Sequence, residues 1–249
     1  MCATDRIDAT APAPATTRML GSSAAGAPGL TDTYRLVCNE NMKAATKTAP
    51  AKQPDVTRDK IVDAAYEEIY RHGFQAASLA NILAKTGLTK GALYHHFPTK
   101  NDLGLAVIDE VVGEGFEVRI FSPLREAEDP VETLRDVIQR KADGATAESV
   151  KYGCALNNLM QEMSPLDTGF KRRLNTILAT WQDTVSAALE RAQKQGWVRK
   201  DVDCRAAALF IVSAYEGCIG IAKNLQSVKE FRLCMAQLDA YVQGLEVRR

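Results

Sequence analysis

The 249-residue sequence has no apolar run that approaches the roughly 20 residues needed for a membrane-spanning helix. Its N-terminus also lacks the continuous hydrophobic region of a secretory signal. Lysine plus arginine number 31, as do aspartate plus glutamate, so the net charge of zero favours neither a polyanion nor a membrane surface as partner. We therefore predict a cytoplasmic protein with no membrane partner, and any electrostatic argument must rest on local clusters of charge.

The sequence also lacks a C-x-x-C pair, although it contains six widely spread cysteines. This spacing is typical of neither a disulfide framework nor a zinc site. We expect free thiols that pack as small hydrophobic side chains. The cysteines are Cys2, Cys38, Cys154, Cys204, Cys218 and Cys234.

Enzyme motifs are missing too. We find no Gly-rich phosphate loop, no nucleophile elbow and no catalytic triad, since all three histidines lie between residues 72 and 96. We predict that the protein is not an enzyme and needs no cofactor. A small all-α enzyme remains one alternative, and a helical adaptor that does not bind nucleic acid is the other.

Residues 1–54 are rich in Ala, Thr, Pro and Gly and contain few large apolar side chains. Such a composition cannot bury enough surface to fold, so we predict a disordered leader. A lysine-bearing stretch begins at Met42, just ahead of the first periodic segment. Translation from Met42 is therefore one hypothesis.

From Thr57 onward, apolar residues recur at helical spacing and no alternating strand pattern appears. The predicted fold class is all-α. After three short helices ending near Pro98, further helices are expected at about residues 100–120, 130–145, 152–163, 166–195, 204–225 and 228–245.

Residues 78–97 have the dimensions of a helix-turn-helix. Ser78 and Thr89 are suited to begin the two helices as N-caps. Gly87 is suited to the left-handed position that ends the first helix. The segment therefore predicts two short helices with a tight turn between them.

The second of these helices has a polar face that contains a glycine. At about 100° per residue, Gly91 and His95 point away from the buried side formed by Leu93 and Phe97. A glycine costs about 1 kcal/mol in a helix relative to alanine. On an exposed first turn, however, it lets a bulky partner such as the DNA major groove approach the backbone closely.

Local charge supports this interpretation, because no acidic residue occurs between Glu68 and Asp102. Phosphates favour such a segment. The basic residues within it are Arg71, Lys85, Lys90 and Lys100, together with the three histidines. We predict no metal site at His95 and His96, because adjacent helical side chains diverge and no cysteine or carboxylate is near in sequence.

The stretch from Gly73 to Asp109, GFQAASLANILAKTGLTKGALYHHFPTKNDLGLAVID, resembles the DNA-binding domain of TetR-family transcriptional regulators. The resemblance implies a three-helix DNA-binding domain over residues 55–115, followed by a helical ligand-binding and dimerisation domain over residues 116–249. It also implies a homodimeric repressor that a small molecule or electrophile releases from a palindromic, double-stranded operator.

The same resemblance assigns the DNA contacts. Lys90, Gly91 and Ala92 would approach bases, whereas Tyr94, His96 and Lys100 would hold phosphates. Ser78 and Thr89 would add hydroxyl or backbone contacts at helix starts, and His95 would contact a base edge or the backbone.

In the C-terminal half, YGCALNNLMQEM at residues 152–163 resembles acrylate- and electrophile-responsive members of that family. The resemblance makes Cys154 a possible sensor thiol, which would react as thiolate if a helix N-terminus lowers its pKa. The alternative is a small buried residue. We further predict an apolar ligand cavity with a few polar groups. Its predicted lining residues are Cys154, Asn157, Met160, Trp181, Tyr215 and Glu216.

The last two predicted helices carry many small residues, among them Ala214, Gly217 and Gly220. In the resembling family, the last two helices of each copy form a four-helix dimer interface. Small side chains would permit the close approach that such an interface needs. A homodimer would hold two recognition helices about 34 Å apart.

Overall fold

The computed structural model describes residues 56–247. The predicted disordered leader and the Met42 start lie outside these residues. Within the described range, the all-α prediction is confirmed, and the one β contact is an isolated bridge between Val198 and Glu246. The elements are α2 (Val56–His72), α3 (Leu79–Thr86), α4 (Lys90–His96), α5 (Lys100–Val107), η1 (Ile108–Gly113), α6 (Glu114–Phe116), η2 (Glu117–Phe121), α7 (Ser122–Glu126), α8 (Pro130–Asp143), α9 (Ala147–Tyr152), α10 (Ala155–Met163), α11 (Thr168–Lys194), α12 (Cys204–Leu225) and α13 (Val228–Gln243).

The ends of α3 and α4 follow from local side-chain chemistry. The Ser78 hydroxyl accepts a hydrogen bond from the Asn81 backbone N–H at 3.4 Å, and Thr89 does the same for Ala92 at 3.2 Å. Gly87 has a φ of 69°, a left-handed conformation that glycine adopts without strain. The two predicted N-caps and the predicted C-terminal glycine are confirmed.

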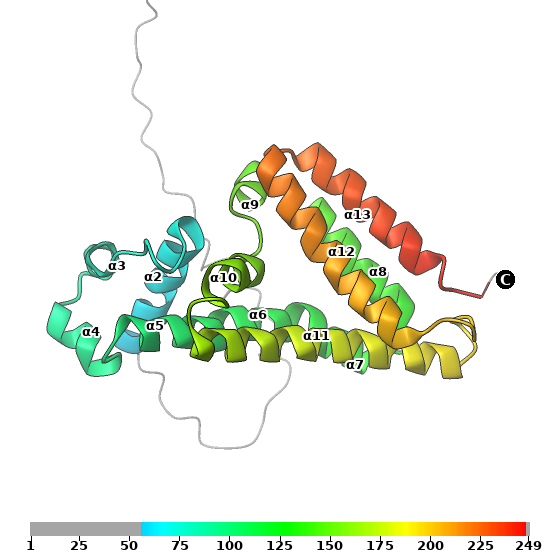
Figure 1. The fold of residues 1–249 in the computed structure, drawn as a ribbon, viewed down its shortest axis with the longest axis horizontal. Helices are drawn as coiled ribbons and strands as arrows, with labels where there is room; N and C mark the ends of the chain where they lie inside the picture. Colours follow the sequence, from blue (N-terminus) through cyan, green and yellow to red (C-terminus); the bar gives the residue numbers. More distant parts are fainter. Residues whose placement is uncertain (1–55, 248–249) are drawn as a thin grey trace, which may run out of the picture.

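Two groups of helices are joined by a long central layer (Figure 1). Helices α2, α3 and α4 lie at one end, and α8, α12 and α13 pack together at the other. Helix α11 lies alongside the continuous helical segment from α5 to α7. Helix α10 packs against α11 between the two groups. Trp181 and Phe170 of α11 are among the largest fully buried side chains. Burying each such side chain contributes about 1.5–3 kcal/mol.

Two of the predicted helix boundaries need correction. The helix expected at 100–120 continues to Glu126, with π-helical turns at η1 and η2. The helix expected at 152–163 begins at Ala155 instead, because Gly153 has a φ of 76° and separates α10 from the preceding α9, which was not predicted. Cys154 then becomes the N-cap residue of α10.

The prediction that no segment could span a membrane also needs correction. Helix α12 is long and apolar enough to do so by length and composition, although half of its most apolar window is buried inside the protein. The core helix of a soluble protein has the same composition, so α12 is weak evidence for a membrane. The buried apolar residues of α12 pack against α11 and α13.

The prediction of free thiols fails for one pair. Cys218 of α12 and Cys234 of α13 form a disulfide with a Cα–Cα distance of 5.6 Å. The two positions meet because α12 and α13 pack against each other, which cysteine spacing alone does not reveal. Cys154 and Cys204 are free.

Candidate nucleic-acid interface and internal cavity

Helix α4 presents a continuous exposed face at one end of the molecule (Figure 1). Leu93 and Phe97 are buried, whereas Lys90, Tyr94 and His95 are exposed. The Lys90 ammonium lies 5.7 Å from the centre of the Tyr94 ring, on the same side of the helix. Of the remaining predicted contact residues, Gly91 and Thr89 are exposed, and Ala92, His96, Ser78 and Lys100 are half-buried.

Gly91 leaves the backbone of α4 open. A Cβ atom placed on Gly91 would have one neighbour within 4 Å, the Thr89 hydroxyl at 3.8 Å. The fold therefore has room for a side chain at this position. A glycine there leaves space next to the backbone that a bulky partner can occupy.

The folded arrangement corrects the argument from the acid-free segment. Glu67 pairs with Lys85, and Glu148 pairs with Arg71 at 2.8 Å, so carboxylates from elsewhere neutralise two of the basic residues. Over residues 56–247, Lys90 and Lys100 form no salt bridge. The positive charge available to a phosphate is therefore concentrated on these two lysines.

Lys100 is held at the turn between α2 and α3. Its ammonium donates a hydrogen bond to the Gln75 carbonyl at 2.9 Å and lies 5.0 Å from the centre of the Phe74 ring. Lys100 therefore holds this turn in place.

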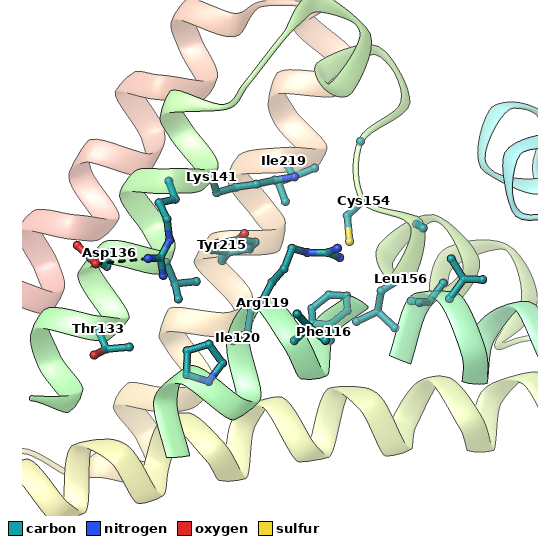
Figure 2. Close-up of a pocket in the computed structure, with 18 of the residues that line it drawn as sticks. Phe116, Arg119, Ile120, Thr133, Asp136, Lys141, Cys154, Leu156, Tyr215 and Ile219 are labelled. Carbon is teal, nitrogen blue, oxygen red and sulfur yellow. Dashed lines mark hydrogen bonds and ion pairs between the residues drawn. The ribbon is translucent and has the colours of Figure 1, made fainter. Parts of the chain in front are cut away.

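A cavity of about 830 Å³ lies between α8, α12, the start of α10 and the run from η1 to α7. Apolar residues such as Phe116, Leu156 and Ile219 form part of its wall. Figure 2 shows Arg119 extending across it towards Cys154, and Lys141 extending towards Ile219. Its size and mixed lining are typical of sites that bind small organic molecules.

Two of the six predicted cavity residues, Cys154 and Tyr215, line this cavity. Trp181 lies behind the wall, with its ring 4.9 Å from that of Phe116 and 5.1 Å from that of Tyr215. The other four residues that were predicted to line the cavity are not among its lining residues, so their predicted position is corrected. They are Asn157, Met160, Trp181 and Glu216.

Sequence reasoning missed the polar side of the cavity. Thr133, Asp136, Arg140 and Lys141 project from one face of α8. Their spacing of three, four and seven residues is a helical signal that could have indicated a shared surface. Arg119 carried no such signal, because it belongs to a π-helical turn.

Glu216 is a buried carboxyl next to the cavity wall. Its exposed fraction is 7%, and its two side-chain oxygens make no hydrogen bond that meets ordinary distance and angle limits among the described residues. Burial raises the pKa of Glu216 to about 7, although Cys154, Lys141 and Asn157 oppose the increase. Burial therefore favours the protonated form of this carboxyl.

Cys154 stands at the N-terminus of α10, but its thiol is not activated. Burial raises the pKa of Cys154, and the nearby Glu216 carboxyl raises it further. The Asn157 backbone N–H acts in the opposite direction, with a smaller effect. The helix N-terminus therefore fails to lower the pKa of the thiol, contrary to the condition set for a reactive sensor.

Helices α12 and α13 carry exposed apolar side chains. Phe210 and Tyr241 lie 4.6 Å apart between ring centres, and Ile221 is 64% exposed. Gly217 of the same helix has nothing within 4 Å of the position that a Cβ would take. Other members of this apolar surface are Leu209, Leu225 and Leu233.

Comparisons with protein families match both halves of the chain. Residues 61–107 match the model of bacterial regulatory proteins of the tetR family. Residues 130–238 match the model of the tetracyclin repressor-like C-terminal domain. Together the two models span more than half of the chain. The chain belongs to the TetR family.

Individual relatives agree with this family. The transcriptional regulator AcuR of Cereibacter sphaeroides is 28% identical over 196 residues, which are 78% of this chain and 88% of the relative. The HTH-type transcriptional repressor DhaR of a Mycobacterium species is 25% identical over 181 residues, or 70% and 87% of the two chains. A solved structure of a regulatory protein TetR from Rhodobacter sphaeroides has a TM-score of 0.68 at 25% identity and covers 78% of this chain and 100% of its own.

TetR-family membership makes the protein a DNA-binding transcription regulator, and its relatives are regulators rather than enzymes. The exposed face of α4 falls inside the N-terminal match. The polar face of α8 and the residues from Gly153 to Ile219 that line the cavity fall inside the C-terminal match.

Proposed function

We propose that this regulator is a homodimeric, cytoplasmic repressor that a small molecule releases from a palindromic operator. In this proposal residues 55–115 bind DNA, and residues 116–249 bind the effector and form the dimer. The observation that carries the proposal is the exposed face of α4, where Lys90 has no salt bridge over residues 56–247 and Gly91 leaves the backbone open. Lys90, Gly91 and Ala92 would meet bases.

The phosphate contacts would surround this base-reading surface. Tyr94, His96 and Lys100 supply a hydroxyl, an imidazole and an ammonium near α4. Ser78 and Thr89 stand at the N-termini of α3 and α4, where backbone N–H groups favour anions. His95, exposed between these groups, would contact a base edge or the backbone.

A second copy of the chain is the proposed partner of the apolar surface on α12 and α13. Exposed apolar side chains on two neighbouring helices are typical of a dimer interface. A four-helix arrangement would cover Phe210, Ile221 and Leu233 at once and would use the open space at Gly217 for close approach.

The cavity is the proposed effector site. Its volume and its combination of aromatic, aliphatic and charged side chains support binding of a small organic molecule. An electrophile that modifies Cys154 is the other form of effector. The raised pKa of Cys154 favours a ligand that binds reversibly, because the thiolate is the reactive form.

Operator binding can be tested with purified full-length protein and a library of genomic fragments. We expect selective retention of the fragment upstream of its own gene, with an affinity that falls steeply as salt is raised. Lys90→Ala should weaken this retention, whereas Lys229→Ala, at an exposed lysine of α13, should keep it. A wild-type protein that retains no fragment at low salt would support the helical adaptor instead.

A further inference from the structure

Helix α10 connects the cavity to the helix-turn-helix. Gly153, Cys154, Ala155 and Leu156, at its start, form part of the cavity wall. Its last turn carries Glu162, which contacts the turn between α2 and α3. The helix is nine residues long, so at 1.5 Å per residue it spans about 13 Å. A short helix of this kind moves as one unit, because bending it would break its backbone hydrogen bonds.

Both carboxylate oxygens of Glu162 accept hydrogen bonds from the α2–α3 turn. The Phe74 N–H donates to one oxygen and the Gln75 N–H donates to the other, each at 2.8 Å. A carboxylate that accepts two backbone hydrogen bonds is held in one orientation, and charge-assisted bonds are stronger than neutral ones. The turn therefore follows the position of Glu162.

Gly73 makes this contact possible. It ends α2 with a φ of 80°, and a Cβ at this position would lie 2.9 Å from a Glu162 oxygen. A larger residue would be strained and would also push the carboxylate away. The geometry of the turn is thus adapted to receive a side chain from α10.

The start of α10 has its own connection to the DNA-binding helices. The Tyr70 hydroxyl of α2 donates a hydrogen bond to the Gly153 carbonyl at 2.8 Å. Gly153 belongs to the cavity wall, and its φ of 76° marks the break between α9 and α10. Contacts at both ends of α10 therefore join the C-terminal end of α2 to the segment that a cavity ligand would touch.

The α2–α3 turn that Glu162 holds also positions groups that face DNA in the proposed function. Gln75 accepts the hydrogen bond from Lys100 through its carbonyl while it donates to Glu162 through its N–H. Three residues later, Ser78 begins α3. A displacement of Glu162 would thus reach both Lys100 and the start of the helix-turn-helix.

We infer that Glu162 is the positioning residue that couples occupation of the cavity to operator binding. A ligand that displaces residues 153–156 moves α10, and Glu162 carries this movement to the turn at Phe74 and Gln75. This inference rests on the proposed function, since it assumes ligand-responsive binding of DNA. Coupling is reciprocal, so operator binding must also alter the cavity wall. The reverse effect can be measured without knowing the effector.

The experiment uses amide hydrogen exchange of the full-length dimer, with and without a saturating concentration of the operator fragment. In the wild type, operator should slow exchange of the amides in residues 153–158 by about fivefold or more, the lower end of typical coupling. In Glu162→Gln, the amide oxygen can accept one backbone N–H but the NH₂ group cannot accept the other. Saturating operator should then leave exchange in residues 153–158 nearly unchanged.

Two controls separate positioning from stability. Glu190→Gln makes the same chemical change on α11, where Glu190 accepts a hydrogen bond from Ser186 of its own helix, and it should keep the wild-type response. Val242→Ala in the α13 core lowers stability away from α10, and it too should keep the response. Should Glu162→Gln fail to fold, Tyr70→Phe removes the other contact and should reduce the response.

The inference is overturned if folded Glu162→Gln shows the wild-type response, if Tyr70→Phe does so in its place, or if operator leaves residues 153–158 of the wild type unaffected. One further result would reject the proposed function as well as the inference. A wild-type protein that binds no fragment has no operator response to couple, so both the function and the inference would be rejected.

Discussion

Cys154 lies beside Glu216 where α10 meets α12, and the buried carboxyl adds to the burial that raises the pKa of the thiol. Glu216 itself has no hydrogen bond of ordinary geometry to its side-chain oxygens within the described part of the chain. The positive charge of Lys141 on α8 and the side chain of Asn157 on α10 both lower the pKa of Glu216, against the effect of burial. Two titratable groups thus lie together next to the cavity, and each responds to the charge of the other.

The first prediction concerns pH and stability. Burial raises the pKa of Glu216 from 4.5 to about 7, so between these values the folded protein holds a proton that the unfolded chain has released. Stability must therefore fall as pH rises through this range and then level off. The loss is on the order of 3 kcal/mol, since each pH unit corresponds to about 1.4 kcal/mol.

Glu216→Gln removes this titration. Relative to the wild type, the variant should gain stability as pH rises from 4.5 to 7, and urea unfolding monitored at several pH values measures the difference. Glu128→Gln, at an exposed glutamate, provides the matched control for the chemical change alone. A pH-independent difference between wild type and Glu216→Gln would contradict the assignment.

The second prediction concerns the reactivity of Cys154. Because its thiol stays protonated at neutral pH, Cys154 should react with N-ethylmaleimide more slowly than free glutathione does. Glu216→Gln should accelerate the reaction, because it removes the negative charge that opposes the thiolate. Mass spectrometry of the peptide containing Cys154 gives both rates. Modification of Cys154 faster than glutathione would show that the resting site activates the thiol.

The sensor role of Cys154 has a separate test. An electrophile should release the wild type from operator less effectively than a reversible cavity ligand does, and Cys154→Ser should abolish any release that depends on modification. Binding assays before and after treatment supply the comparison. If Cys154→Ser is released as readily as the wild type, the sensor hypothesis is wrong.

The third prediction concerns Lys90. If its ammonium reads a guanine, Lys90→Ala should weaken operator binding by about 1–3 kcal/mol and should leave binding to random DNA nearly unchanged. Equal losses on both DNAs would instead mark a phosphate contact. Titrations at two salt concentrations distinguish these outcomes, because loss of a phosphate contact reduces the salt dependence by about one ion.

Much of the fold could be read from local sequence. Ser78, Gly87 and Thr89 mark helix ends through chemistry that acts within three or four residues, and α12 was predicted with its observed bounds. Helix α9 was missed, because its six residues are too few to show a clear helical period. The π-helical turns of η1 and η2 carry no local signal, and they set the orientation of Arg119.

The cavity was harder to predict, because its wall is assembled from segments far apart in the sequence. Tyr215 lies on this wall, whereas Trp181 packs one layer behind it. A buried aromatic residue looks the same in sequence whether it faces a cavity or a neighbouring ring. The Cys218–Cys234 disulfide and the pairing of Lys85 with Glu67 were missed for the same reason, since each depends on how helices pack.

The fourth prediction uses Gly91 to separate folding from DNA binding. Gly91→Ala should stabilise the free protein by up to about 1 kcal/mol, because alanine favours the helix and its Cβ would meet nothing closer than 3.8 Å. The same change should weaken operator binding if DNA lies against the α4 backbone, and Gly91→Leu should weaken it further. Thermal unfolding and operator titration measure the two effects. A Gly91→Leu protein that binds operator normally would show that DNA does not approach this face.

The fifth prediction concerns the apolar surface of α12 and α13. Ile221 is 64% exposed, so Ile221→Glu should leave the fold of one copy intact. In a two-fold symmetric dimer, the change would place two carboxylates in the same interface, which should cost at least about 2 kcal/mol and weaken association about 30-fold. Light scattering on a size-exclusion column measures the oligomeric state.

Leu166 offers the matched control for this test. It is 61% exposed but follows α10, away from α12 and α13, so Leu166→Glu should remain dimeric under the same conditions. The comparison decides between two causes of dissociation, because both variants add one carboxylate to the surface. If only Leu166→Glu dissociated, the dimer interface would instead lie near the junction of α10 and α11. A dimer that both variants leave intact would mean that the α12–α13 surface is covered in some other way.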